Sequence, residues 1–309
     1  MKITVSVVIP IFNEEKNIPI LFKRLEKTLK KLTSSYEIIF INDGSHDKSL
    51  QKLKELRNKN KKVKIATFSR NFGHMSAVNA GLVLSLGEKV IIMDADLQDP
   101  PEVIEKMWHK SKEGYQVIYG IKEKRKENFV RKFLFSTFYK ILNNISSYKM
   151  PLDAGTFSLL DRKIVNILIN LPEKNKYISG LRAWTGFKQT GIVYERAARY
   201  SGKPMSIRKL TKLAMDGMIS FSYLPLRLAS FFGFICATLA IIAIIGVIIL
   251  RIFFGWGIIG WASTLTTILL VSGVQLITLG IIGEYLARIY DEVKGRPEYI
   301  FSEKIGFKK

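Results

Sequence analysis

The chain has 309 residues, and 48 Lys and Arg against 26 Asp and Glu give it a formal net charge of +22. A balance this basic indicates an anionic partner, such as phosphorylated substrates, anionic lipid headgroups or nucleic acid. The single cysteine, Cys236, excludes an internal disulfide and a cysteine-based metal site.

Strand and helix patterns alternate along about the first 190 residues. Apolar runs predict strands at 6–10, 36–43, 63–68 and 89–93. Apolar residues at helical spacing predict helices at 17–32, 49–60 and 75–86. This alternation favours βαβ units, so we predict an α/β doubly wound domain with a mostly parallel sheet. Ligands of such sheets bind beyond the carboxyl ends of the strands.

Side chains with oxygen atoms follow the predicted strand at 89–93. Asp94 and Asp96 occupy alternate positions directly after it, and Gln98 follows two residues later. Carboxylate and amide oxygens suit Mg²⁺ or Mn²⁺, and these cations in turn suit a diphosphate. Taken alone, the segment also fits a polar strand-to-helix turn with capping carboxylates.

Two uncharged runs, 228–250 and 252–283, each exceed the roughly 20 residues needed to cross the hydrocarbon core of a bilayer. Arg251 and a turn rich in Gly and Trp, which ends at Trp261, separate them. The other interpretation is a pair of buried core helices. Several basic residues flank the pair on both outer sides, whereas only Arg251 lies between the runs. The positive-inside rule therefore places both termini in the cytoplasm.

Five motifs occur in order along the chain, at 8–14, 42–47, 69–73, 94–101 and 153–157. As a set they resemble glycosyltransferase family 2, in its dolichol- and polyprenyl-phosphate hexose synthase branch. The chain is similar to the bacterial undecaprenyl-phosphate glucosyltransferases that carry a two-helix anchor. The resemblance covers nearly the whole chain. It implies a nucleotide-sugar transferase domain of the GT-A fold, interfacial helices and a C-terminal two-helix transmembrane hairpin.

The resemblance also implies a domain plan. A cytoplasmic GT-A catalytic domain (1–204) is followed by a juxtamembrane amphipathic segment (205–227), the transmembrane hairpin (228–287) and a cytoplasmic tail (288–309). The apolar start of the chain lacks the small-residue cleavage site of a signal peptide, so it is interpreted as a strand. The expected location is the inner or plasma membrane, with two spans.

The same resemblance assigns the donor site. It implies that the nucleotide sugar is bound by Pro10, Phe12, Asn13, Glu14, Asp43, Arg70 and Asp94. It also implies that Mg²⁺ or Mn²⁺ is ligated by Asp94, Asp96 and Gln98, with Asp96 as a catalytic residue. Asn13 and Glu14 also fit a helix N-terminal cap. Asp43 also fits a simple turn, and Arg70 also fits a brace for its own loop.

The acceptor implied by the resemblance is a polyprenyl phosphate, which calls for cations near the membrane surface. The matching positions are Arg131, Ser136, Arg182, Arg196 and Arg199, with Lys132 or Phe135 as the alternative match for the first two. A basic stretch (122–132) ahead of an aromatic-rich helix suits an interface with anionic lipid, and a solvated charged face is the alternative. Asp153 is a further catalytic candidate. A phosphate acceptor is already ionised at pH 7, so Asp153 could instead bind sugar hydroxyls or cap a turn.

The expected reaction is inverting transfer of a hexose to undecaprenyl or another polyprenyl phosphate. The expected donor is UDP-glucose, with GDP-mannose or another UDP-sugar as the alternative. The expected partners are the nucleotide sugar, the polyprenyl phosphate, membrane lipid and further copies of the chain in a homo-oligomer, but no nucleic acid. A polysaccharide synthase is less favoured, because the segment 179–184 lacks the Gln-x-x-Arg-Trp motif of those enzymes.

Overall fold

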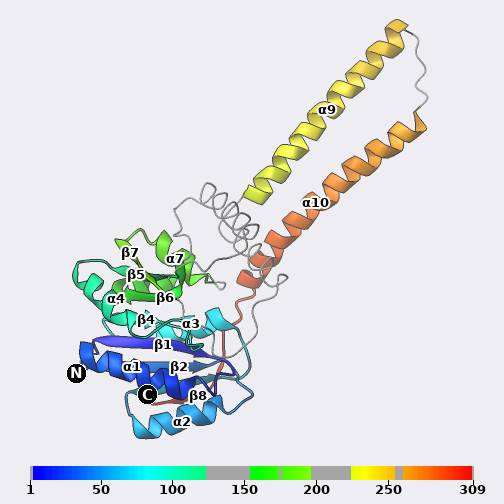
Figure 1. Cartoon of the computed structure of the whole chain (residues 1–309). Helices are drawn as coiled ribbons and strands as arrows, with labels where there is room; N and C mark the ends of the chain where they lie inside the picture. The colour runs from blue at the N-terminus through cyan, green and yellow to red at the C-terminus, as the bar shows by residue number, and fades with distance from the viewer. Residues whose placement is uncertain (1–2, 123–153, 174–175, 196–223, 255–259, 308–309) are drawn as a thin grey trace. The chain divides into compact units, whose positions relative to one another are not determined.

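A computed structural model describes residues 3–122, 154–173, 176–195, 224–254 and 260–307 (Figure 1). The chain divides into two compact units. One unit is formed by Met1–Met205 together with Arg296–Lys309, and the other is formed by Ser206–Gly295. The C-terminal residues therefore return to the unit that contains the N-terminus. Among the predicted site residues, Asp153, Arg131, Ser136, Arg196 and Arg199 lie outside the described residues.

The first unit is built on an eight-stranded sheet with the order β7-β5-β6-β4-β1-β2-β3-β8. Its strands are β1 (Val5–Ile11), β2 (Tyr36–Asn42), β3 (Val63–Phe68), β4 (Lys89–Ile92), β5 (Val117–Lys122), β6 (Ala154–Asp161), β7 (Gln189–Tyr194) and β8 (Phe301–Ile305). Strands β4, β1, β2 and β3 are parallel neighbours, as expected. Strand β7 also runs parallel to β5, but the sheet as a whole is mixed, because β6 runs antiparallel to β4 and β5, and β8 runs antiparallel to β3.

Hydrophobic burial on both faces explains the central strands. All residues of β1 and β2 are buried, which is why they form continuous apolar runs rather than alternating patterns. Helices of the unit are α1 (Ile18–Leu32), α2 (Ser49–Lys59), α3 (His74–Leu84), α4 (Val103–Lys112), α6 (Arg162–Asn170) and α7 (Ile178–Trp184). Side chains of α1 and α4 pack on one face of the sheet, and side chains of α3 pack on the other. The result is a three-layer arrangement (Figure 1).

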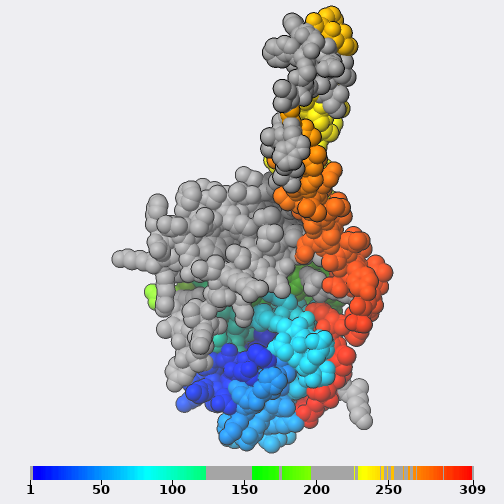
Figure 2. Space-filling view, turned by 90° about the vertical axis from the view of Figure 1, so that its right-hand side faces the viewer, coloured from blue at the N-terminus to red at the C-terminus, as the bar shows by residue number. Residues whose placement is uncertain are grey.

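The sequence did not predict β8. Its central residues Ser302, Glu303 and Lys304 are polar and exposed, so the segment has no apolar run. It nevertheless pairs with β3 along Ile65–Ile305 to Phe68–Phe301 and covers that edge of the sheet. Figure 2 shows these C-terminal residues, in red, beside the cyan surface of the segment that contains α3.

The second unit holds two long helices, α9 (Leu224–Phe254) and α10 (Trp261–Val293). Helix α9 continues through Arg251 to Phe254, because a single Arg is compatible with a helix interior, and α10 begins at Trp261. Among the described residues, Leu270–Val293 is long and apolar enough to cross a membrane, whereas Ala229–Ala243 is a shorter apolar segment. Large apolar side chains on both helices are more than half exposed, among them Phe234, Phe253, Leu270 and Leu276.

Candidate functional site

Three of the predicted motifs meet at the carboxyl ends of the central strands. Strand β1 lies between β2 and β4, with Ile11 opposite Asn42 and Val8 opposite Ile92. Because these strands are parallel, the segments that follow them leave the sheet side by side. The register therefore brings Phe12, Asp43 and Asp94 together at the carboxyl ends of these strands, as the sequence predicted.

The loops after β1 and β2 are joined by hydrogen bonds. The Asn13 N–H donates to Ser45 Oγ at 3.0 Å, and the His46 N–H donates to Asn13 Oδ1 at 2.9 Å. The Glu14 N–H donates to Ser49 Oγ at 2.9 Å. Asn13 adopts a φ of 57°, a left-handed conformation that is uncommon outside glycine and is concentrated at functional sites.

These contacts revise the interpretation of the first loop. The N-cap position of α1 is held by Asn17, so the helix-cap reading is wrong for Asn13. Glu14 accepts a hydrogen bond from Asn17 Nδ2 at 2.5 Å. Pro10 is buried within β1 rather than in the loop. Phe12 is 43% exposed and its ring lies nearly perpendicular to that of His46, 6.2 Å between centroids, so it is available to a ligand.

Asp43 connects β2 to the loop before α3. Its carboxylate accepts hydrogen bonds from the N–H groups of Phe72 (2.7 Å) and Gly73 (3.0 Å). Burial raises the pKa of Asp43, against the effects of these two donors and of His74. A Cβ atom on Gly44 would lie 2.6 Å from the Arg70 carbonyl carbon, so the segment 69–73 crosses directly over this glycine. Asp43 thus holds the backbone of the segment 69–73 in place beside the site.

Arg70 is exposed and lies over the ring of Phe72, with 4.3 Å between the guanidinium carbon and the ring centroid. This contact fits the bracing role for its loop. An exposed guanidinium at this edge is also free to turn toward an anionic ligand.

The two motif aspartates differ in environment. Asp94 Oδ1 is buried without a hydrogen-bond partner, and it lies 3.5 Å from His74 Nε2. Burial raises the pKa of Asp94, and the neighbouring Asp99 and Asp96 act in the same direction, while His74 and Lys122 oppose it. Asp96 Oδ1 accepts the Gln98 N–H at 3.1 Å, and the intervening Leu97 has a φ of 62°. This turn holds strained backbone and an excess of negative charge.

Such a turn fits a divalent-cation site whose coordination is completed by the substrate. In the described part of the chain, no three His, Cys, Asp or Glu side chains converge into a closed metal site. Mg²⁺ is usually bound by one or two carboxylates together with substrate phosphates, so a closed protein site is not required. The buried, unpartnered Asp94 Oδ1 provides one suitable oxygen.

Two further residues, His74 and Asp99, complete the surroundings of Asp94 and were not assigned a role from the sequence. His74 begins α3, directly after the 69–73 motif. Asp99 is 1% exposed, accepts the Tyr194 hydroxyl at 2.5 Å and lies 3.4 Å from Lys122 Nζ. The sequence did carry a signal for both residues. Asp99 lies within the 94–101 motif, and His74 directly follows the 69–73 motif.

Arg182 is the one predicted acceptor residue that lies within the described parts of the chain. Its side chain is fully buried on α7, and none of its three guanidinium nitrogens has a hydrogen-bond partner among the residues that the structure describes. The guanidinium carbon lies 5.1 Å from the centroid of the Tyr119 ring. Burial lowers the pKa of Arg182 to about 10, against the effects of Tyr177 and Tyr119. A buried cation with no carboxylate beside it in the described parts of the chain is the arrangement expected where an anionic ligand binds.

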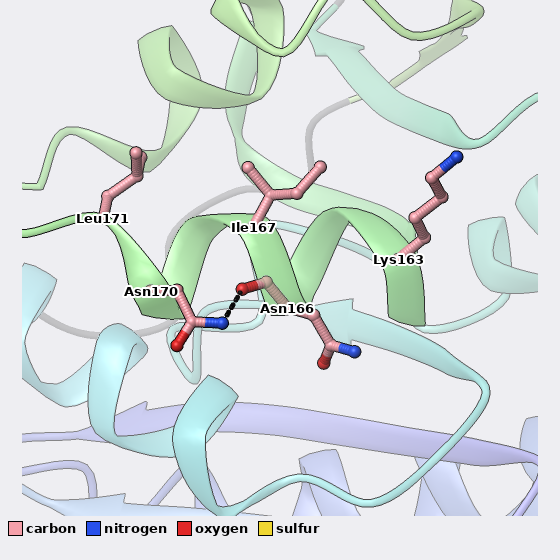
Figure 3. A pocket seen from close by; sticks show the side chains of 5 residues that line it. All are labelled: Lys163, Asn166, Ile167, Asn170 and Leu171. Atoms are coloured by element: carbon pink, nitrogen blue, oxygen red, sulfur yellow. Dashed lines mark hydrogen bonds between the residues drawn. The ribbon is translucent and has the colours of Figure 1, made fainter.

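An open depression of about 480 Å³ lies elsewhere, along α6 (Figure 3). Lys163, Asn166, Ile167, Asn170 and Leu171 line it, and Asn170 Nδ2 donates to the Asn166 carbonyl within it. None of the predicted site residues lines this depression, and all its lining residues come from one helix and its end. It is therefore not the candidate site.

Comparisons with known proteins agree with this geometry. The family model "Glycosyl transferase family 2" matches residues 6–168. A glycosyltransferase of Bacillus subtilis, YkcC, described as uncharacterized, is 42% identical over 97% of this chain and 94% of its own length. The SfII prophage-derived bactoprenol glucosyl transferase of Shigella flexneri is 36% identical over 97% of both chains.

A solved structure shows the same fold. It is the glucosyl-3-phosphoglycerate synthase of Mycobacterium tuberculosis in complex with Mn²⁺, UDP and glucosyl-3-phosphoglycerate. It matches with a TM-score of 0.52 at 17% identity, over 70% of this chain and 77% of that one. The family model covers more than half of the chain, and the curated relatives extend that similarity over nearly all of it. This protein therefore belongs to glycosyl transferase family 2 and is a glycosyltransferase with a GT-A-like fold.

Proposed function

We propose that the protein transfers glucose from UDP-glucose to the phosphate of a polyprenyl phosphate, such as undecaprenyl phosphate, with inversion at the anomeric carbon. One observation carries this proposal. The similarity to the bactoprenol glucosyl transferase covers 97% of the chain and so extends far beyond residue 168, where the family model ends. GDP-mannose or another UDP-sugar is the alternative donor.

The donor side follows from the strand-end loops. Phe12, Asn13 and Glu14 would contact the nucleoside from the first loop, next to the segment that Asp43 holds in place. Asp94, Asp96 and Gln98 would hold Mg²⁺ or Mn²⁺. When bound, this cation supplies a Lewis acid for the leaving diphosphate. The solved relative contains Mn²⁺ and UDP, which supports this assignment.

The reaction breaks the bond between the sugar C1 and the UDP oxygen and forms a bond from C1 to an acceptor phosphate oxygen. The acceptor is ionised at pH 7 because the second pKa of a phosphate monoester is near 6. It therefore needs orientation and charge compensation more than a general base. Arg182 would supply a buried cation for this purpose, and Asp99 holds Lys122 beside Asp94 as another. Asp153 then serves the sugar hydroxyls or the acceptor protonation state.

The acceptor also explains the C-terminal helices. We propose that α9 and α10 both span the membrane, with both termini and the 1–204 domain in the cytoplasm. The exposed apolar side chains on both helices support this, because a soluble protein rarely leaves an apolar surface of that extent uncovered. The acceptor phosphate would then lie at the headgroup level, near the basic segment. We further propose that the protein works as a homo-oligomer, which mass photometry in detergent would test.

The direct test supplies the purified full-length protein with undecaprenyl phosphate and a panel of labelled nucleotide sugars. We expect label from UDP-glucose to enter an acid-labile lipid product, UDP to be released, and both to require a divalent cation. Transfer from GDP-mannose alone would change the assigned donor. Label in a polymer instead of a lipid would refute the proposed acceptor.

A further inference from the structure

The donor-site loop is held from two sides. On one side, Asp43 accepts the N–H groups of Phe72 and Gly73. On the other side lies the C-terminal segment 298–302, more than 200 residues later in the sequence. The sequence pattern predicted only a cytoplasmic tail at this position.

Aromatic packing joins this C-terminal segment to the loop. The ring of Tyr299 stacks on Phe68 with 5.1 Å between centroids and an interplanar angle of 16°. Phe68 in turn contacts the ring of Phe72 edge-on at 5.6 Å. Phe72 is the residue whose N–H donates to Asp43, so a continuous series of contacts runs from Tyr299 to Asp43.

Hydrogen bonds follow the same path. The Ser69 N–H, at the start of the loop, donates to the Ile300 carbonyl at 2.9 Å. Ser302 Oγ donates to the Thr67 carbonyl at 3.1 Å. Asn79 Nδ2 on α3 donates to Glu298 Oε2 at 2.5 Å. The C-terminal segment thus holds the strand before the loop, the first residue of the loop and the helix after it.

The helix matters because of its first residue. Helix α3 begins at His74, whose Nε2 lies 3.5 Å from Asp94 Oδ1. A shift of the loop would therefore move both the backbone donors of Asp43 and the imidazole beside the proposed cation ligand. Misplacement of groups around a reacting centre by about 1 Å can cost up to about 100-fold in rate.

We propose that the C-terminal segment 298–302 is a positioning element of the donor site, an inference that rests on the proposed function. Tyr299 and Glu298 act through Phe68, Phe72 and α3, and they contact no substrate. The chain places this element directly after α10. Binding of the nucleotide sugar therefore depends on correct seating of the segment that follows the last helix.

The test uses the full-length protein in detergent and three variants. Tyr299→Ala removes the ring from Phe68, and Tyr299→Phe keeps it. Glu303→Ala is the matched control, because it breaks the 2.8 Å ion pair between β8 and Lys54 on the side away from the loop. We expect Tyr299→Ala to raise the KM for UDP-glucose by about two- to tenfold, the range for the loss of one aromatic pair. The KM for the lipid acceptor should stay unchanged, and the other two variants should match the wild type.

Hydrogen exchange gives a readout that does not depend on the sugar transferred. The amide protons of Phe72 and Gly73 should exchange faster in Tyr299→Ala than in Tyr299→Phe. This exchange measurement does not depend on which donor the wild type uses. Failure of the proposed function and failure of this inference therefore remain distinct. Where Tyr299→Ala does not fold, Glu298→Ala provides the same comparison through Asn79. Unchanged exchange at both amides, or an equal rise in both KM values, would overturn the positioning role.

Discussion

The guanidinium of Arg182 lies over the ring of Tyr119, 5.1 Å from its centroid, and is fully buried with no hydrogen bond to any residue that the structure describes. Taking a cation out of water is costly unless an anion or several acceptors replace the water. Among the residues described, its electrostatic neighbours are Tyr177 and Tyr119 rather than a carboxylate. The fold thus holds a destabilised cation on α7, which an anionic acceptor would stabilise.

Replacing Arg182 should therefore separate stability from activity. We expect Arg182→Met to raise the free energy of unfolding, on the scale of the about 1–4 kcal/mol gained when buried ion pairs are replaced by well-packed apolar side chains. The same variant should raise the KM for polyprenyl phosphate, while Arg182→Lys should retain part of the affinity because it keeps the charge without the planar fork. Thermal unfolding and steady-state kinetics of the same preparations measure both effects. A destabilised Arg182→Met with a normal acceptor KM would show that the guanidinium is structural.

The Asp94 and Asp96 carboxylates should be required for transfer. We expect Asp94→Asn and Asp96→Asn each to reduce kcat by at least about 100-fold, since each removes a charge from the turn that would hold the cation. Asp161→Asn is a suitable control, because Asp161 pairs with Lys89 at the opposite end of β4. Chelation by EDTA should abolish transfer by the wild type, and Mg²⁺ or Mn²⁺ should restore it. Turnover that persists in EDTA would contradict the metal assignment.

The membrane topology can be tested by cysteine labelling. Cys236 is the single native cysteine, so its replacement by Ala gives a background without thiols. A cysteine introduced at Lys308 should be protected from an impermeant reagent added to intact cells, whereas one introduced at Trp256 should react. Labelling of both positions, or of position 308 alone, would contradict two spans with cytoplasmic termini.

A buried charged network at the other end of the sheet should matter for stability alone. Glu37 is 1% exposed, accepts hydrogen bonds from Ser6 Oγ (2.5 Å) and the Leu86 N–H (2.8 Å), and pairs with Lys64 Nζ at 2.5 Å. Glu37→Gln would leave the Lys64 ammonium without its anion, and we expect a loss of about 3–5 kcal/mol in unfolding free energy.

The control for this network is Glu113→Gln, which breaks an exposed pair with Lys110 and should leave the free energy of unfolding nearly unchanged. Both substrate KM values should be normal in the folded Glu37→Gln protein, because Glu37 lies near the amino ends of the strands. A changed KM for either substrate would show that this network reaches the site.

Glu298 predicts a dependence of stability on pH. Burial raises its pKa above the ordinary 4.5, against the effects of Asn79, Lys176 and Ser76. The folded state then binds this proton more tightly than the unfolded state, so stability falls as pH rises from 4.5 through the raised pKa. The Glu298→Gln variant has no titrating group at this position, so its stability should not fall with pH for this reason. We expect the variant and the wild type to melt alike near pH 4.5, and the variant to melt higher at pH 7. Melting curves across this range test it, and a constant difference would contradict it.

The sequence predicted the centre of the fold well for a simple reason. The strand at 63–68 and the helix at 17–32 match β3 and α1 closely, because burial leaves a strong apolar pattern. The same logic placed Phe12, Asp43 and Asp94 at one edge. Strand β8 could not be found, since its side chains are polar and only backbone pairing with β3 makes it a strand.

Roles that depend on the tertiary arrangement were also beyond the sequence. Nothing local indicates that Asn13 accepts the His46 N–H instead of capping α1. The antiparallel direction of β6 depends on how the chain returns to the sheet, which composition does not encode. Likewise, the burial of Arg182 without an acceptor follows from packing around α7, where its sequence neighbours are unremarkable.

The pairing of β8 with β3 has a consequence for biosynthesis. Ile65 pairs with Ile305, so the edge of β3 stays uncovered until the ribosome has made both C-terminal helices and nearly the whole chain. An uncovered strand edge is a template for unwanted pairing, and contacts this distant in sequence form late. Pairing of β8 would thus close this edge of the sheet only after both helices have been made. Affinity tags at the N-terminus would leave the pairing of β8 with β3 undisturbed, whereas fusions to the C-terminus, next to β8, would interfere with it.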